Sequence, residues 1–529
     1  MSLSHEKYFP LDLDSISDVG LETWQKNFYW PISWIDFLEI EEKLTGILDT
    51  DIQEYQGHPI ADLLLINYKI YLEYSNFIHE LIVLKDIKRK GLLPVFKSSE
   101  RYRAIFNNGI PGKCLVAAPT LNGAGRLKSM LQSMRLTCEL LRHRLWPKVI
   151  GPQAYITDSS LNDTTLKYLK KNSVGGIKPR PFLTWAKVRA TIPEHEASKI
   201  KEFCESLVKR VAGVASAYEI IFDEEQIRYL YETTVAIFLA AYELLLRVQA
   251  TLNGNAGGHL FLGSNNNALS RILSVALRKR GGKVSAFSHG EPLVYQWKKI
   301  AWMELSLVDE YIEYSDALAG VLRQTTQVFP PPNKNHPEII GGYFSPLKAI
   351  RIREQDKPSP LNIERVMLIG NAYKETGLSC VTCFPAPVQF DLELRLIKYL
   401  QQVGYKVVYK KHPGGVLKGN DFEFLSLGAE VLDGAFEENL DRADAYFFYY
   451  TRTSTLGPAL CTNKPIFIVD GGWEKIPRKL RSVLEKRCTF VKCAFSDRNT
   501  LKFDESAFQG LNNEIEKAQN SDFADTYLF

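Results

Sequence analysis

The run Lys410-Lys411-His412-Pro413-Gly414-Gly415 combines cationic side chains with a forced change of backbone direction. It follows residues 405–410, a predicted strand, and proline cannot continue the hydrogen-bond ladder of a sheet, so His412 is expected at the sheet's carboxyl edge. Two ammonium groups and an imidazole at such an edge could neutralise a departing nucleotide phosphate. The following glycines favour this interpretation over a solvated basic turn, which the two lysines alone would indicate.

A second run, Thr451-Arg452-Thr453-Ser454-Thr455, is rich in hydroxyl groups. It lies between a predicted strand at 445–450 and a short predicted helix at 456–461. Hydroxyls beside the free amides of a helix start can hold a phosphate, although they also serve as ordinary helix caps. Because the run comes shortly after the His-Pro turn, we expect Thr453, Ser454 and Thr455 to bind the same anionic group.

A third segment, Ser288-His289-Gly290-Glu291-Pro292, closes a predicted strand at 283–288. A histidine beside a carboxylate could take a proton from a hydroxyl group that acts as nucleophile. The spacing leaves open whether His289 or Glu291 would be the base. A capped turn is the structural alternative.

Weaker signals also follow strands. Gly263-Ser264-Asn265 follows residues 259–263 and is expected to line a cleft, and Gly370-Asn371 follows residues 365–369 and is expected to contact the same ligand as His412. Asp49-Thr50-Asp51 has the D-x-D form that can hold a metal on a diphosphate, but the pattern around it favours a surface turn. Cys380 and Cys383 form a C-x-x-C pair without the second pair of a zinc site. Neither a metal nor a cofactor is therefore expected.

These segments need a frame that places strand ends together. From residue 259 short apolar strands alternate with helices, which predicts a parallel sheet covered on both faces. The strands are expected at 259–263, 283–288, 308–314 and 338–340, and after a linker at 365–369, 405–410, 429–432, 445–450 and 465–469. Residues 346–362 are charged and proline-containing, with no apolar period, and are expected to form that linker.

The predicted fold class is α/β, with two Rossmann-like domains facing across a cleft and extra N-terminal helices. The domains are expected at 1–345, with helical additions such as 194–211 and 224–252, and at 363–529. Ligands of such sheets bind beyond the carboxyl ends of the strands.

Composition sets outer limits on function. A chain of 529 residues exceeds one ordinary core, so two lobes are expected. The net charge of +4 is too small to indicate nucleic acid, but it leaves room for peripheral contact with an anionic membrane. The N-terminus lacks the layout of a signal peptide. The most apolar stretch, 235–246, is interrupted by Glu243 and is expected to be a buried helix. These features predict a cytoplasmic protein, peripheral at most at the inner face of the membrane.

Together the three motifs resemble those of GT-B glycosyltransferases. Lys411-His412-Pro413 resembles the His-Pro motif of bacterial sialyltransferases, polysialyltransferases and capsule-type Kdo transferases, and Thr453-Ser454-Thr455 resembles their Ser/Thr motif. A more distant likeness is to teichoic-acid polymerases, whose Trp-His-Gly-Thr-Pro segment corresponds to residues 288–292. The resemblance covers about residues 259–472.

This resemblance implies a function and roles. The donor would be a CMP-activated acidic sugar of the sialic acid or Kdo kind, and the acceptor a bacterial surface glycan or its lipid-linked precursor. His412 would contact the donor phosphate, Ser454 and its neighbours would hold it, and His289 would be the candidate base. Three alternatives remain open: a phosphotransferase that uses CDP-glycerol or CDP-ribitol, a non-catalytic protein of glycan assembly and, more distantly, a sugar-nucleotide epimerase, since such epimerases also use paired Rossmann lobes.

Overall fold

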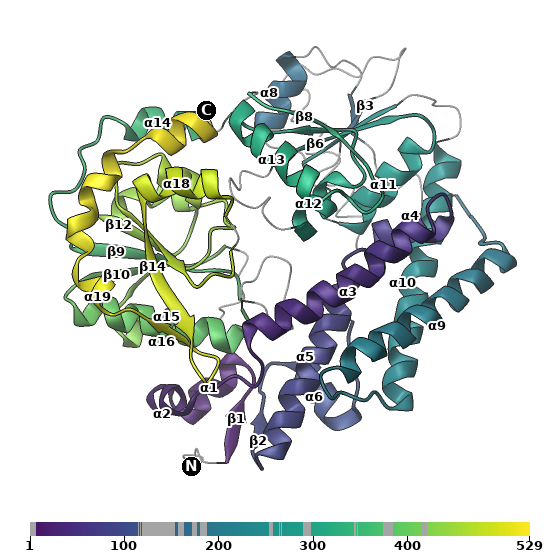
Figure 1. The fold of residues 1–529 in the computed structure, drawn as a ribbon, viewed down its shortest axis with the longest axis horizontal. Coiled ribbons are helices and arrows are strands. Elements are labelled where there is room, and N and C mark those ends of the chain that lie inside the picture. Colours follow the sequence, from purple (N-terminus) through teal and green to yellow (C-terminus); the bar gives the residue numbers. More distant parts are fainter. Residues whose placement is uncertain are drawn as a thin grey trace.

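Two parallel sheets and a block of N-terminal helices make up the fold (Figure 1). The computed structural model describes residues 7–114, 116, 118, 154–156, 163–171, 177–179, 188–252, 258–263, 265, 267–288, 298–342, 345, 347–373, 384–413, 421–474 and 476–529.

The C-terminal sheet has seven strands in the order β11-β10-β9-β12-β13-β14-β15. All neighbouring pairs are parallel except β14 with β15. Counted from β9, the first six strands follow the Rossmann order 3-2-1-4-5-6, so the order reverses between β9 and β12. The strands are β9 (Arg365–Ile369), β10 (Lys406–Lys410), β11 (Glu430–Leu432), β12 (Ala445–Phe448), β13 (Ile466–Asp470), β14 (Cys488–Phe495) and β15 (Leu501–Phe503).

Both faces of this sheet are covered, which explains why its central strands are apolar throughout rather than alternating. Leu368 and Phe447 face one apolar cluster, and Met367 and Phe448 face a second one. The α-helices of this lobe are α14 (Leu347–Glu354), α15 (Ala386–Gln402), α16 (Asp421–Ser426), α17 (Leu456–Leu460), α18 (Arg478–Arg487) and α19 (Ser506–Gln509). It also contains the 3-10 helices η4 (Phe436–Glu438), η5 (Leu440–Arg442) and η6 (Leu511–Gln519) and the π-helix η7 (Ala524–Leu528).

The N-terminal sheet has six parallel strands in the order β4-β3-β5-β6-β7-β8, and its order reverses between β3 and β5. Its strands are β3 (Ala154–Ile156), β4 (Ile177–Pro179), β5 (His259–Leu262), β6 (Lys283–Phe287), β7 (Glu310–Ile312) and β8 (Glu338–Ile340). The helices that accompany it are α8 (Asp163–Lys171), α11 (Ala268–Arg278), α12 (Lys298–Leu305) and α13 (Asp316–Val328).

A block of long helices extends from this second lobe (Figure 1). It contains α3 (Trp34–Glu54), α4 (Pro59–Ile66), α5 (Ile70–Arg89), α6 (Glu100–Asn108), α9 (Glu194–Ser216) and α10 (Glu224–Thr251), and before it come α1 (Leu13–Val19), α2 (Leu21–Asn27) and the parallel pair β1 (Tyr8–Pro10) and β2 (Leu93–Val95). Among the described helices, α10 alone is long and apolar enough by composition to cross a membrane. It packs against α9, α11 and α4, so its apolar side chains have protein partners.

The ends of the chain cross between the lobes. Trp24 of α2 packs against Phe390 of α15 with 5.9 Å between ring centroids, so α2 contacts the C-terminal lobe. Conversely, the hydroxyl of Ser315, at the start of α13, donates to the carbonyl of Tyr527 at 2.6 Å. Segments near both ends of the described chain therefore contact the opposite lobe.

Two local expectations were wrong. The linker at 346–362 contains α14, whose Leu347 and Ile350 pack on the C-terminal sheet; the helix has only two turns, too few to show a period. Asp49-Thr50-Asp51 is not a surface turn but part of α3, where buried Asp51 pairs with Arg210 at 2.5 Å. By contrast, the helix expected at 224–252 is confirmed as α10, which includes the apolar stretch 235–246.

Candidate functional site

The strand order of the C-terminal sheet reverses between β9 and β12, and we call this place its switch point. Hydrogen bonds between strand ends hold it together. The backbone N–H of Gly370, after β9, donates to the carbonyl of Lys410 in β10 at 3.0 Å. The hydroxyl of Tyr450, after β12, donates to the carbonyl of Gly370 at 3.3 Å. The ends of β10, β9 and β12 are thus bound to one another at one edge of the sheet.

The predicted residues of this lobe lie at that edge. Gly370 and Asn371 follow β9, Lys410 to Pro413 end and follow β10, and Thr453 to Thr455 follow β12. Because β9 lies between β10 and β12, the His412 and Ser454 segments start two inter-strand spacings apart, about 10 Å. A nucleotide placed over the end of β9 would therefore have one segment on each side.

A buried carboxylate beneath the edge binds three tyrosines. Glu393 of α15 is fully buried, and its Oε2 accepts from the hydroxyls of Tyr373 and Tyr409, the latter at 2.8 Å. Its Oε1 accepts from the hydroxyl of Tyr449 at 2.5 Å and from the side-chain amide of Gln389 at 3.3 Å. Since each carboxylate oxygen accepts about two hydrogen bonds, this carboxylate is saturated. We call Glu393 with these three tyrosines the tyrosine cluster.

The tyrosine cluster joins the three strand ends of the switch point. Tyr409 is in β10, Tyr373 follows β9 and Tyr449 follows β12. Burial raises the pKa of Glu393 to about 7, against the hydroxyl hydrogen bonds, which lower it. Burial also raises the pKa of each tyrosine, so near neutral pH the hydroxyls remain protonated donors.

Glycine at position 370 is required by this arrangement. A Cβ at Gly370 would lie 2.3 Å from the hydroxyl oxygen of Tyr409 and 2.6 Å from its Cζ. The Tyr409 ring cannot retreat, because it stacks on Phe424 with 4.1 Å between ring centroids and is bound to Glu393. The backbone of residue 370 therefore approaches the ring more closely than any other residue type would allow.

The two predicted lysines have partners within the protein. Lys410 is buried, and its Nζ donates to the carbonyl of Lys411 at 2.8 Å; burial lowers its pKa. Lys411 pairs with Asp433 at 3.0 Å across the adjoining turn. His412 is half-buried and Pro413 is exposed. Of the three basic residues expected here, Lys411 and His412 therefore lie partly exposed at the edge of the sheet. Lys410 is buried, and its ammonium group holds the turn through the carbonyl of Lys411.

Part of the hydroxyl-rich run 451–455 is bound to the carboxylate of Glu474, which was not among the residues predicted from the sequence. Glu474 accepts from the backbone N–H of Thr451 at 2.9 Å and from its hydroxyl at 2.5 Å, and it pairs with Arg452 at 3.5 Å. Thr453 and Thr455 bind each other through their hydroxyls at 2.8 Å, and α17 begins without a side-chain cap. Ser454 is the exposed member of the run. The hydroxyl of Thr453 also accepts from the backbone N–H of Thr455 at 3.3 Å, so the threonine hydroxyls of the run are bound within the protein.

Glu474 follows β13, the strand next to β12. A signal for it was present in the sequence, because Gly471-Gly472 comes one residue after the predicted strand at 465–469, much as Gly370 follows the predicted strand at 365–369. Gly472 has φ +78°, and a Cβ at Gly471 would overlap the ring of Trp473. The two glycines turn the chain so that Glu474 returns to the neighbouring strand end.

The N-terminal sheet carries its own candidate residues at its own switch point. Gly263 and Asn265 follow β5, and the backbone N–H of buried Asn265 donates to Glu304 at 3.0 Å. Buried Arg271 donates to the carbonyls of Asn265 at 3.2 Å and Met303 at 2.5 Å. Within the part of the chain that the structure describes, the side-chain amide of Asn265 has no hydrogen-bond partner.

Several predicted residues lie outside the described residues: Ser264, His289, Glu291, Gly414, Cys380 and Cys383. The base candidates are among them, so their position relative to His412 stays a prediction. Among the residues that the structure does describe, no three His, Cys, Asp or Glu side chains are grouped as a metal site would need.

Comparisons with known proteins bear on the arrangement of the chain. No protein-family model and no curated protein matches it. Among solved structures, a candidate UDP-N-acetylglucosamine 2-epimerase from Listeria monocytogenes is similar at 8% identity and a TM-score of 0.39, over 72% of this chain and 93% of that one. UGT2 of Phytolacca americana, solved with UDP-2-fluoroglucose and pterostilbene, is similar at 11% identity and a TM-score of 0.32, over 70% and 94%. Likenesses of this strength say nothing of the reaction. The strand orders themselves show two Rossmann-like units, to which N-terminal helices are added.

Proposed function

We propose that this chain is a metal-independent glycosyltransferase that moves an acidic sugar from a CMP-activated donor to a bacterial surface glycan or its precursor. The observation that carries the proposal is the position of the His412 and Ser454 segments on either side of β9, at the point where the Rossmann strand order reverses. Sheets of this kind bind nucleotides at that point.

The chemistry assigned to the site is displacement at the sugar's anomeric carbon. A bond forms to the acceptor oxygen, the bond to the phosphate oxygen breaks, and CMP leaves with the bonding electron pair. The acceptor's proton passes to a base, for which His289 or Glu291 is proposed, a step that typically contributes about 10²–10⁴ in rate. Charge develops on the leaving phosphate, where His412, Lys411 and the hydroxyl of Ser454 would stabilise it.

A nucleotide panel tests the donor class directly. CMP at saturating concentration should raise the melting temperature more than UDP or GDP does, because a ligand that binds only the folded state stabilises it. Equal shifts for all three nucleotides would remove the cytidine assignment. Turnover of CDP-glycerol or CDP-ribitol, with none of CMP-sugars, would replace the proposal by the phosphotransferase alternative.

A pair of histidine variants tests the site. His412→Ala should reduce transfer by about 10²-fold or more, as expected for loss of a group that stabilises the leaving phosphate. His336→Ala, an exposed histidine in the N-terminal lobe, is the matched control and should transfer at the wild-type rate. Excess EDTA should leave the wild-type rate unchanged. A wild-type rate in His412→Ala, or a strict requirement for a divalent cation, would each overturn the corresponding part of the proposal.

A further inference from the structure

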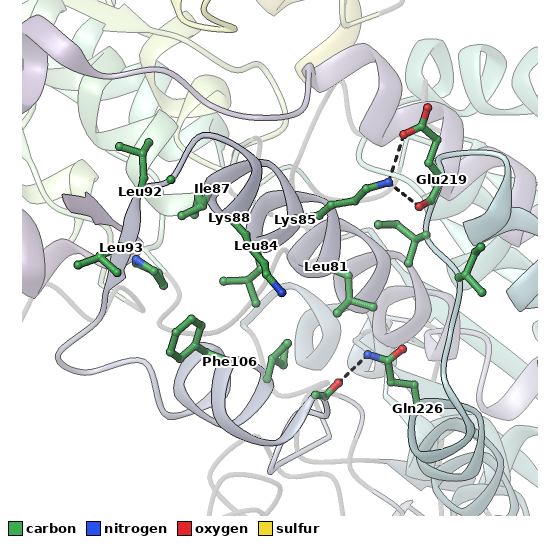
Figure 2. A pocket seen from close by; sticks show the side chains of 16 residues that line it. Leu81, Leu84, Lys85, Ile87, Lys88, Leu92, Leu93, Phe106, Glu219 and Gln226 are labelled. Atoms are coloured by element: carbon green, nitrogen blue, oxygen red, sulfur yellow. Dashed lines mark hydrogen bonds and ion pairs between the residues drawn. The ribbon is translucent and has the colours of Figure 1, made fainter. Parts of the chain in front are cut away.

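A groove open to solvent lies between α5, α6, β2 and the turn that joins α9 to α10 (Figure 2). Its volume is about 880 Å³. Leu81 and Leu84 of α5 form one wall, and Phe106 of α6 forms the opposite one. Of the described residues that line the groove, none comes from the two large sheets. The groove is thus separate from the strand ends at which we place the nucleotide.

Large apolar side chains at its rim are unusually exposed. The exposed fractions are 51% for Leu93, 53% for Phe106 and 88% for Ile221, and the three residues come from three different segments. Single exposed apolar residues are normal on protein surfaces, but several around one groove indicate a site that binds an apolar ligand.

Two of the described residues that line the groove are lysines, Lys85 and Lys88, and they differ in their partners. Lys85 donates to the carbonyl of Glu219 at 2.7 Å and to its carboxylate at 3.1 Å, so these two side chains neutralise each other. Arg89 and Lys90 both pair with Asp86. Lys88 makes no ion pair with any residue that the structure describes, and Figure 2 shows its side chain extending toward the hollow between α5 and Phe106.

We propose that this groove binds a single-chain anionic amphiphile, with an alkyl, acyl or isoprenyl chain along the apolar walls and a phosphate or carboxylate head at Lys88. The groove supplies apolar surface for the chain and one unmatched positive charge for the head. Its volume falls within the range of about 300–1,000 Å³ that is usual for small-molecule sites. The proposal does not depend on the reaction proposed above.

A chain-length series is the sharpest test. Octyl, decyl and dodecyl phosphate, each below its micelle concentration, should bind with an affinity that rises about fourfold for each added methylene group, as measured by titration calorimetry. Inorganic phosphate alone should give no measurable heat. A neutral alkyl glucoside of equal chain length should bind roughly fivefold to tenfold more weakly than the phosphate, since it forgoes the charged contact.

Three variants separate the contributions. Phe106→Ser should weaken dodecyl phosphate about tenfold or more by removing a wall of the groove. Lys88→Met should keep the dependence on chain length but lose the preference for phosphate over glucoside. Val328→Ser, at an exposed apolar position of α13, is the matched control and should bind as the wild type does.

Absence of saturable binding, equal affinities across the chain lengths, or wild-type affinity in Phe106→Ser would each overturn the proposal. A concentration-dependent dimer in sedimentation that Phe106→Ser abolishes would instead assign the groove to a second copy of the chain. The melting-temperature response to CMP, measured on the same variants, should be unchanged, so failure here and failure of the proposed reaction are distinguishable.

Discussion

The backbone N–H of Asn371 donates a hydrogen bond to the hydroxyl of Tyr449, with 3.0 Å between the two atoms. Asn371 follows β9 and Tyr449 follows β12, so this bond closes the sheet at the point where its strand order reverses. The same hydroxyl donates to Glu393 at 2.5 Å. One side-chain oxygen thereby connects the candidate nucleotide loop to the tyrosine cluster.

Tyr449→Phe should weaken both the fold and the nucleotide response. It leaves the N–H of Asn371 without its acceptor and removes one donor from Glu393, which should lower the free energy of unfolding by about 1–3 kcal/mol. Because Asn371 would lose one of the hydrogen bonds that position it, the rise in melting temperature caused by CMP should fall to roughly half or less. Urea unfolding and thermal shift, each with and without CMP, measure the two effects.

Tyr446→Phe provides the control. Tyr446 is also buried in β12, but its hydroxyl donates to the carbonyl of Leu440 at 2.8 Å, outside the tyrosine cluster. Tyr446→Phe should lower the free energy of unfolding by a similar amount and leave the rise in melting temperature caused by CMP unchanged. Equal CMP responses in the two variants would contradict the assignment of Tyr449 to the nucleotide loop.

The carboxyl of Glu393 should make stability depend on pH. Burial raises its folded-state pKa to about 7 from the ordinary value of 4.5, so between these values the folded protein binds more protons than the unfolded chain. Stability contributed by this group therefore falls as pH rises from about 4.5 to about 7, by roughly 3 kcal/mol in total, and changes little above that. Glu393→Gln removes the titration while keeping the shape of the side chain.

The measurement is the free energy of urea unfolding at several pH values. As pH rises from about 4.5 to about 7, the free energy of unfolding of the wild type should fall relative to that of Glu393→Gln. Glu438→Gln makes the same substitution at an exposed position and should follow the wild-type curve. Parallel curves for wild type and Glu393→Gln would show that this carboxyl titrates alike in the folded and unfolded states.

The sequence predicted the edge of the sheet better than what lies beneath it. Strand alternation and the residues that end each strand are local signals, so the positions of Gly370, His412 and Thr453 at one edge followed from them. Glu393 sits within a long helix, and Tyr409 and Tyr449 belong to apolar strands. Periodicity indicates that such residues are buried but does not identify their partners, because these contacts join segments 16 and 56 residues apart.

The N-terminal part was harder for a related reason. Its helices were expected, but their placement depends on contacts between distant segments, such as that of Trp24 with Phe390. The pairing of Asp51 with Arg210 is of the same kind, since it spans 159 residues and turns an apparent metal motif into a helix-to-helix ion pair. No local pattern carries that information.

Gly370→Ala should disturb the site through a single methyl group. The new Cβ would overlap the Tyr409 ring, and because that ring is held by Phe424 and Glu393, the loop after β9 must move instead. Overpacking of this kind costs about 1–3 kcal/mol, and the displaced loop should lose most of its CMP response.

Gly213→Ala is the matched control, because nothing lies within 4 Å of its Cβ. Gly213 is exposed within α9, so its substitution should raise stability by about 0.5–1 kcal/mol. An undiminished CMP response in Gly370→Ala would place the nucleotide away from β9.

The ion pair between Lys411 and Asp433 allows a test by gain of binding. Asp433 has a side chain that is 80% exposed and lies 3.0 Å from the ammonium of Lys411, so it competes with any phosphate that Lys411 would bind. Asp433→Asn should tighten CMP binding about twofold to fivefold at low ionic strength, and this gain should vanish near about 0.5 M salt. Its effect on the free energy of unfolding should stay below about 1 kcal/mol, as for other exposed pairs. Lys411→Met should weaken binding about tenfold.

Asp441→Asn is the control for this pair, because it frees Lys357 from another exposed ion pair, of 2.9 Å, at a different place on the lobe. It should leave CMP binding unchanged. If Asp433→Asn binds CMP no better than Asp441→Asn does, and Lys411→Met binds it as tightly as the wild type, then Lys411 makes no contact with the nucleotide. The basic turn after β10 would in that case be an ordinary solvated turn, and recognition of the phosphate would have to come from the segment after β12.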